Sequence, residues 1–80
     1  MAQITVYGST WCGFTQRAIR HMNELGVEYT FVDVDKNPDA EALIASWNNG
    51  RSIRPTFDIN GQHLVNPSAQ QIRDAMTNVE

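Results

Sequence analysis

The side chain best suited to chemistry in this sequence is Cys12, the only cysteine in the chain. It follows a β-branched run at residues 4–7 and precedes a helical pattern that begins near Phe14. This position predicts a thiol at a helix N-terminus, where unpaired N–H groups and the helix dipole favour an anion. The thiolate is the reactive form of cysteine, so the position favours nucleophilic chemistry. The alternative is a small buried hydrophobic side chain, as free cysteines commonly are.

Two features favour a reactive Cys12. A strand-to-helix junction lies at the carboxyl edge of an open α/β sheet, where ligands gather. Gly13 also leaves the sulfur less crowded than a bulkier neighbour would. We therefore expect Cys12 to be functional.

The elements around this junction follow from apolar spacing. Residues 4–7 predict a first strand, mostly apolar and central in its sheet. Residues 29–34 predict a second buried strand, because β-branched and aromatic residues alternate there. The helix between them carries its apolar positions at Phe14, Ala18, Met22 and Leu25, with Gly26 at its end.

A second helix is expected to begin with Asn37 as its N-cap and Pro38 as its first residue. Residues 48–50, Asn-Asn-Gly, end it. Its apolar face would be Ala40, Leu43, Ile44 and Trp47.

The last third of the chain predicts a hairpin and a helix. Residues 56–59 and 62–65 flank the Asn-Gly pair at 60–61, which suits a two-residue type I′ turn. Ser68 and Gln71 have the spacing of a capping box. The buried stripe of this helix would be Ala69, Ile72, Met76 and Val79.

The predicted order β-α-β-α-β-β-α defines an α/β fold of the thioredoxin type. The first β-α-β unit requires parallel strands joined by a right-handed crossover, and the hairpin adds two antiparallel strands. We therefore expect a four-stranded mixed sheet flanked by helices on both faces. All 80 residues are expected to form a single domain.

Composition limits the class of protein. The apolar fraction of 41% and charged fraction of 19% are ordinary for a folded chain. One cysteine cannot form an internal disulfide, which argues for a reducing cytoplasm. Residues 1–3 lack the basic region of a signal peptide, and no apolar stretch has the length of a membrane span, so we expect no membrane partner.

Charge is unevenly distributed. The net charge of −3 argues against nucleic acid as a partner. Residues 1–20 carry Arg17 and Arg20 and no acid, whereas residues 21–45 carry six acids against Lys36. The cysteine half is therefore locally basic and suits an anionic substrate; scattered solvated charge is the alternative.

Three segments in the same order resemble the glutaredoxin family, and within it the mycoredoxins of actinobacteria. Residues 11–14 are similar to the start of the mycoredoxin Trp-Cys-Gly-Tyr-Cys motif, and Arg17 falls where mycoredoxins carry an arginine. Residues 55–56, Pro-Thr, occupy the place of a cis-proline loop. Residues 64–68, after Gly61, resemble the mycoredoxin Leu-Thr-Asn-Pro-Ser segment.

The resemblance implies a thiol–disulfide oxidoreductase with Cys12 as its nucleophile. The thiolate attacks a mixed disulfide between a protein and a small thiol, mycothiol or glutathione, and the small thiol stays on Cys12 until a second one removes it. This thiol is a co-substrate rather than a tightly bound cofactor, and we expect a monomer. Trp11, Gly13, Phe14, Thr15 and Arg17 would support the nucleophile, and Arg54, Pro55, Thr56, Asn66 and Ser68 would bind the substrate.

Two of these assignments have alternatives. The family implies a cis Arg54–Pro55 bond facing Cys12, with the Arg54 backbone free to pair with the substrate; an ordinary turn proline is the alternative. Asn66 and Ser68 either cap the last helix or present N–H groups to a substrate carboxylate or sugar-linked group.

Three departures from the family pattern bear on function. Thr15 stands where dithiol members have their resolving cysteine, and it could instead hydrogen-bond the thiolate. Arg54 stands where valine is usual, which predicts a charge next to the substrate groove. Residues 65–66, Val-Asn, replace the usual Gly-Gly pair, which argues against glutathione.

Two other interpretations fit the same motif. Monothiol members with Cys-Gly-Phe-Ser carry an iron–sulfur cluster between two subunits, but this chain lacks the lysine that they place before the cysteine. Thr15 could also be an engineered replacement in a dithiol mycoredoxin, for which serine or alanine is the commoner choice. His21 and His63 lack partners at metal-ligand spacing, so we expect no metal site.

Overall fold

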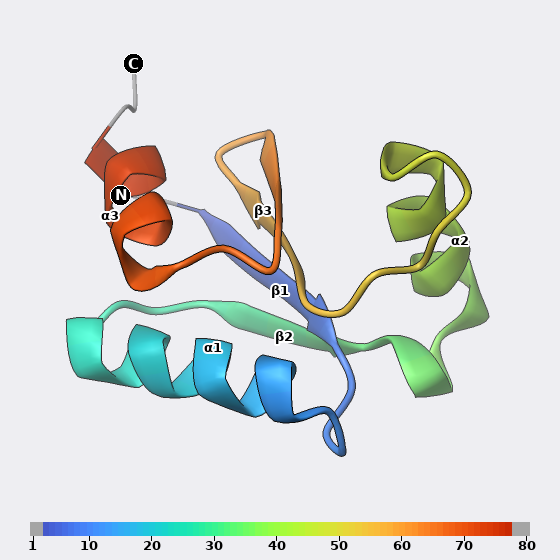
Figure 1. Cartoon of the computed structure of the whole chain (residues 1–80), viewed down its shortest axis with the longest axis horizontal. Helices are drawn as coiled ribbons and strands as arrows, with labels where there is room; N and C mark the ends of the chain where they lie inside the picture. Colours follow the sequence, from blue (N-terminus) through green and yellow to red (C-terminus); the bar gives the residue numbers. More distant parts are fainter. Residues whose placement is uncertain (1–2, 78–80) are drawn as a thin grey trace.

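The computed structural model describes residues 3–77 and has the predicted order of elements (Figure 1). A short 3₁₀ turn, η1, follows the second strand and was not predicted. The elements are β1 (Ile4–Gly8), α1 (Gly13–Leu25), β2 (Thr30–Asp33), η1 (Val34–Lys36), α2 (Pro38–Trp47), β3 (Thr56–Ile59), β4 (Gln62–Val65) and α3 (Ala69–Thr77).

The four strands form one mixed sheet in the order β2-β1-β3-β4. Strand β1 is central, as predicted, because it pairs in parallel with β2 and antiparallel with β3. In the β3–β4 turn, Asn60 and Gly61 have φ of 54° and 90°. Positive φ at both residues is what a type I′ turn requires, so the hairpin prediction is confirmed.

Helices cover both faces of the sheet. Figure 1 shows α1 and α3 on one face and α2 on the other. Under α1 and α3, Met22 and Ile72 pack against Val6 and Phe57, and all four are buried. Burial of each such side chain stabilises the fold by about 1.5–3 kcal/mol. A smaller buried cluster under α2 consists of Val34, Ala40 and Ile44.

The predicted helix signals lie where the helices begin and end. Gly26 ends α1 in the left-handed conformation, with φ of 69°. The Asn37 side chain accepts a hydrogen bond from the backbone N–H three residues later, and Pro38 is the first residue of α2. Ser68 and Gln71 form a reciprocal capping box at α3, with bonds of 3.2 and 2.8 Å.

Three packing predictions are wrong. Strand β2 is shorter than predicted and only partly buried, because it lies at the sheet edge and the chain turns into η1 at Val34. Phe14 is 54% exposed and Leu43 is 42% exposed, although both were assigned to apolar helix faces. Ala40 and Ile44 are the buried residues of α2, and half-buried Trp47 packs beside them against the sheet. Val79, assigned to the buried stripe of α3, lies outside the described residues.

Within residues 3–77, none of the helices combines the length and the apolar character needed to span a lipid bilayer.

Candidate active site

Cys12 is the N-cap residue of α1 and is half-buried. Its backbone is extended, its N–H donates to the Ser9 carbonyl at 3.1 Å, and its own carbonyl accepts from the Gln16 N–H at 3.0 Å. The first-turn N–H groups of α1 have no partner within the helix. The sulfur therefore lies where an anion is favoured, as the sequence predicts.

The pKa of the Cys12 thiol is lowered. Burial raises it, but hydrogen bonds from the Thr15 N–H, the Thr15 hydroxyl and the Phe14 N–H lower it by more in sum. The positive charge of Arg54 lowers it further. A larger fraction of the thiol is therefore ionised at neutral pH than in an ordinary cysteine.

Thr15 is fully buried directly beneath the end of β1. Its Oγ1 accepts a hydrogen bond from the Ser9 N–H at 3.3 Å, so its own proton remains to be donated to the Cys12 thiolate. A Cβ on Gly8 would lie 2.6 Å from Thr15 Cγ2 and 2.7 Å from Oγ1. Gly8 was not predicted from the sequence to matter for the site. Because it has no Cβ, it leaves the space that the Thr15 side chain occupies.

The Arg54–Pro55 peptide bond is cis, as predicted. The carbonyl of buried Pro55 accepts a hydrogen bond from the Asn66 N–H at 2.8 Å, which ties this loop to the end of β4. The Thr56 side chain is fully buried; its hydroxyl donates to the Ile53 carbonyl at 2.7 Å and accepts from Asn48. Thr56 therefore uses its side chain to hold the loop.

Arg54 holds three parts of the chain together. Its Nε donates to Ser9 Oγ at 2.6 Å, and its terminal nitrogens contact the Asp35 and Glu41 carboxylates at 3.2 and 3.0 Å and the Ser52 carbonyl at 2.9 Å. The sequence predicted a charge next to the groove and gave no partners for it. In the structure the guanidinium contacts both carboxylates, so this charge is paired.

Asp35 connects this network to Trp11, the residue before Cys12. The Trp11 Nε1–H donates to its Oδ2 at 2.5 Å. Burial raises the pKa of the Asp35 carboxyl, but hydrogen bonds from Ser9 and Trp11 and the charge of Arg54 lower it by more. Asp35 is therefore a carboxylate at neutral pH.

Two exposed aromatic rings flank Cys12. Trp11 is 70% exposed and Phe14 is 54% exposed, while Gly13 between Cys12 and Phe14 lies in open space. The Arg17 guanidinium carbon lies 5.4 Å from the centre of the Phe14 ring, a cation–π contact. Trp11, Gly13 and Phe14 therefore adjoin Cys12 at the surface, and Thr15 lies in the core. Arg17 lies further along α1 against the Phe14 ring, so its support of Cys12 stays a prediction.

Asn66 and Ser68 lie between β4 and α3, and their N–H groups are already bonded. The Asn66 N–H donates to Pro55 and the Ser68 N–H donates to the Gln71 side chain. The capping alternative is therefore correct for Ser68. Substrate binding by either residue stays a prediction that now concerns their side chains.

Sequence reasoning missed Ser9, Asp35 and Glu41. A topological signal was available for Asp35, which follows β2 directly. Because β2 is parallel to β1, residues after β2 lie at the same sheet edge as the loop that leads to Cys12.

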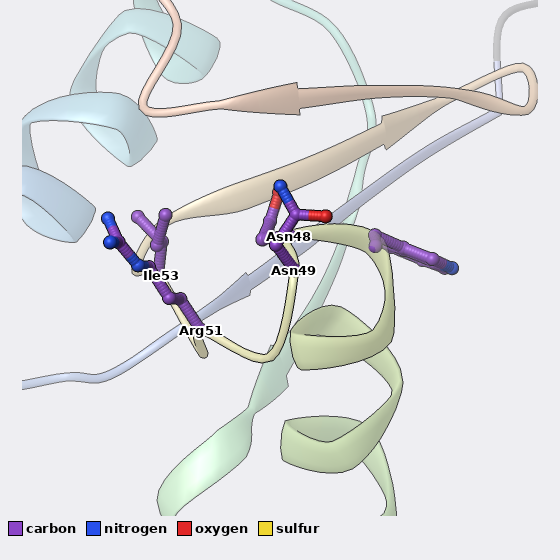
Figure 2. A pocket seen from close by; sticks show the side chains of 5 residues that line it. Asn48, Asn49, Arg51 and Ile53 are labelled. Atoms are coloured by element: carbon purple, nitrogen blue, oxygen red, sulfur yellow. The ribbon is translucent and has the colours of Figure 1, made fainter.

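A shallow pocket of about 460 Å³ lies at the end of α2 and the loop that leads to the cis-proline. Figure 2 shows that Asn48 and Asn49 end the helix and that Arg51 and Ile53 follow on this loop. Trp47 completes the lining and stacks on His63, with ring centres 3.6 Å apart. Trp47 is therefore half-buried between pocket and sheet.

A helix-capping thiol linked through Ser9 to a cis-proline loop, on this sheet order, defines a redox protein of thioredoxin-like fold. The glutaredoxin family model matches residues 4–64, and the chain belongs to the glutaredoxin family. Members of this family are generally thiol–disulfide oxidoreductases.

Individual relatives agree with this assignment. The chain is 32% identical to mycoredoxin 1 of Corynebacterium glutamicum over 73 residues, which cover 90% of each chain. A glutaredoxin structure from Archaeoglobus fulgidus has a TM-score of 0.80 at 17% identity, covering 95% of this chain and 87% of that one. A buckwheat glutaredoxin–glutathione complex has a TM-score of 0.72 at 24% identity, covering 91% and 70%. The two structures show the shared fold.

Proposed function

We propose that this protein removes small thiols from mixed disulfides by a monothiol mechanism in which Cys12 is the nucleophile. One observation carries the proposal: a thiol of lowered pKa caps α1, while buried Thr15 occupies the position of a second thiol. A thiolate at that place both attacks a disulfide and leaves readily from one.

The reaction consists of two exchanges. The Cys12 thiolate attacks the small-thiol sulfur of the mixed disulfide, a new S–S bond forms on Cys12, and the substrate protein leaves as a thiolate. A second small thiolate then attacks the sulfur of the attached small thiol, which releases a small-thiol disulfide and restores the Cys12 thiolate. Each step exchanges one S–S bond for another, so electrons balance.

The walls of the site suggest how the substrate binds. The exposed rings of Trp11 and Phe14 offer apolar contact on the two sides of Cys12, and the backbone of Arg54 before the cis-proline offers polar contact. The resemblance to a mycoredoxin favours mycothiol as the small thiol, and the fold shared with a glutathione complex keeps glutathione as the alternative. An unpaired reactive thiol suits a reducing compartment, in keeping with a cytoplasmic monomer.

The test offers mycothiol and glutathione disulfides to the native chain and follows adducts by intact mass. We expect one adduct per chain, formed faster with the native chain than with the urea-denatured chain, because only the folded chain has the lowered thiol pKa. Cys12→Ser is the matched control and should form none. Equal rates for native and denatured chains would contradict the proposal. A visible chromophore after reconstitution with iron, sulfide and thiol would indicate the cluster carrier instead.

A further inference from the structure

Two carboxylates contact Arg54, the residue before the cis-proline, and outnumber its single positive charge. Asp35 and Glu41 both contact the Arg54 guanidinium, at 3.2 and 3.0 Å. This group of three side chains carries a net charge of −1 (one positive and two negative charges). The group as a whole is therefore acidic, although the Arg54 charge by itself lowers the pKa of the Cys12 thiol.

Hydrogen bonds connect the carboxylates to the residues around Cys12. Asp35 accepts the indole N–H of Trp11, the residue directly before Cys12. Arg54 bonds the Ser9 side chain, and the Ser9 carbonyl accepts the Cys12 N–H at 3.1 Å. A substrate group that contacts the exposed Trp11 ring beside Cys12 therefore approaches Asp35.

The charge around this cluster has the same sign. Along η1 and the start of α2, Asp33 and Asp39 add two further carboxylates, against one cation at Lys36. Arg17 lies on α1 over the Phe14 ring and keeps its positive charge there, apart from this acidic segment. The site therefore has an acidic wall made by η1 and α2, next to the cis-proline loop.

We propose that Asp35 and Glu41 are specificity-determining residues that disfavour an anionic small thiol and favour a neutral or cationic one. This inference rests on the proposed function and names the class of its co-substrate. It also replaces the expectation that the basic N-terminal half selects an anionic substrate. The two carboxylates have side chains that are 35% and 45% exposed, so they face the solution from which the substrate arrives.

The test compares three small disulfides of similar size that differ in their end groups. Cystamine carries ammonium groups, hydroxyethyl disulfide carries hydroxyls and dithiodipropionate carries carboxylates. Single-turnover rates of adduct formation on Cys12 are measured at low ionic strength for the native chain, Asp35→Asn and Glu41→Gln. Both substitutions remove charge and keep shape, and in Asp35→Asn the oxygen of the new amide can still accept the Trp11 N–H.

The readout is the ratio of the cystamine rate to the dithiodipropionate rate. A change in the nucleophilicity of Cys12 alters both rates alike and cancels in the ratio. We expect each substitution to lower the ratio by roughly three- to tenfold, and added salt to shrink the effect. The matched control is Glu28→Gln, which removes the same charge at the far end of α1, roughly 20 Å from Cys12.

The outcomes separate the inference from the proposed function. A ratio unchanged in Asp35→Asn and Glu41→Gln, or lowered equally by Glu28→Gln, would overturn the charge selectivity while Cys12 still reacts. A Cys12 that reacts with none of the three disulfides would overturn both proposals.

Discussion

The hydroxyl oxygen of Thr15 lies 3.3 Å from the backbone nitrogen of Ser9 and accepts its hydrogen bond inside the protein. Thr15 has no exposed surface, and its remaining donor serves the Cys12 thiolate. The position that carries a resolving cysteine in dithiol members is used here to connect the end of β1 to the nucleophile.

Thr15→Val should weaken that connection without changing the volume of the side chain. The valine offers no donor, so the pKa of Cys12 should rise toward its ordinary value. The Ser9 N–H loses its partner, which should cost about 1–3 kcal/mol in unfolding free energy. Thiolate absorbance against pH and urea unfolding measure the two effects. Thr15→Ser keeps the hydroxyl and is the control; a titration curve unchanged in Thr15→Val would contradict the role of the hydroxyl.

Gly8→Ala should destabilise the fold through Thr15. The added Cβ would meet Thr15 Cγ2 at 2.6 Å, a distance that forces a shift in a packed core. We expect a loss of about 1–3 kcal/mol in unfolding free energy. In the double variant with Thr15→Ala, the two closest contacts are gone and only Cβ remains, at 3.2 Å, so the two effects should not add. Additive losses in the urea unfolding of all four proteins would disprove the contact.

Arg54→Met should raise the pKa of Cys12, because it removes a cation and leaves two carboxylates nearby. It should also cost about 1–3 kcal/mol in unfolding free energy, since the charged hydrogen bonds to Ser9 and Ser52 are lost. Arg54→Lys keeps the positive charge but replaces the planar guanidinium and its several donors with a single ammonium group. It should therefore lower the unfolding free energy and change the pKa of Cys12 less than Arg54→Met does. Equal titration of Cys12 in both variants would show that the charge has no effect on the thiol.

The lowered pKa of Cys12 also predicts how stability depends on pH. The thiol has a lower pKa in the folded state than its ordinary 9.0, so the folded state binds fewer protons between these two values. The stabilisation is complete above the unfolded pKa and is lost as the pH falls through the folded pKa. The difference in unfolding free energy between the native chain and Cys12→Ser should therefore grow as the pH rises from below the folded pKa towards 9.0, and level off above it. A constant difference would contradict the thiolate in the folded state.

Local signals predicted most of the fold. Gly26, Asn37 and the Asn-Gly pair at 60–61 act through their own backbone preferences, so the sequence nearby is sufficient to place helix ends and the hairpin. The crossover rule then determines the parallel pairing of β1 and β2.

Packing at the sheet edge was less predictable. Phe14 has the spacing of a core residue, but it lies in the first turn of α1, beside the exposed loop that carries Cys12. Helical periodicity gives the direction of a side chain and does not tell whether the sheet extends beneath it.

Local features of the site were predicted from the sequence, whereas contacts between residues far apart in the sequence were not. Cys12 and the cis bond before Pro55 followed from the sequence. The partners of Arg54 did not, because Ser9, Asp35 and Glu41 are 45, 19 and 13 positions away in the sequence. Side-chain networks of this kind depend on tertiary geometry that periodicity does not encode.

The first exchange on a protein substrate tests the monothiol mechanism most directly. The native chain is mixed with a protein that carries one small thiol as a mixed disulfide, and both are followed by intact mass. We predict that the substrate protein is released reduced while this chain gains one small thiol on Cys12, which excess small thiol then removes. Accumulation of a disulfide between the two proteins, or release of the small thiol in the first step, would contradict the mechanism.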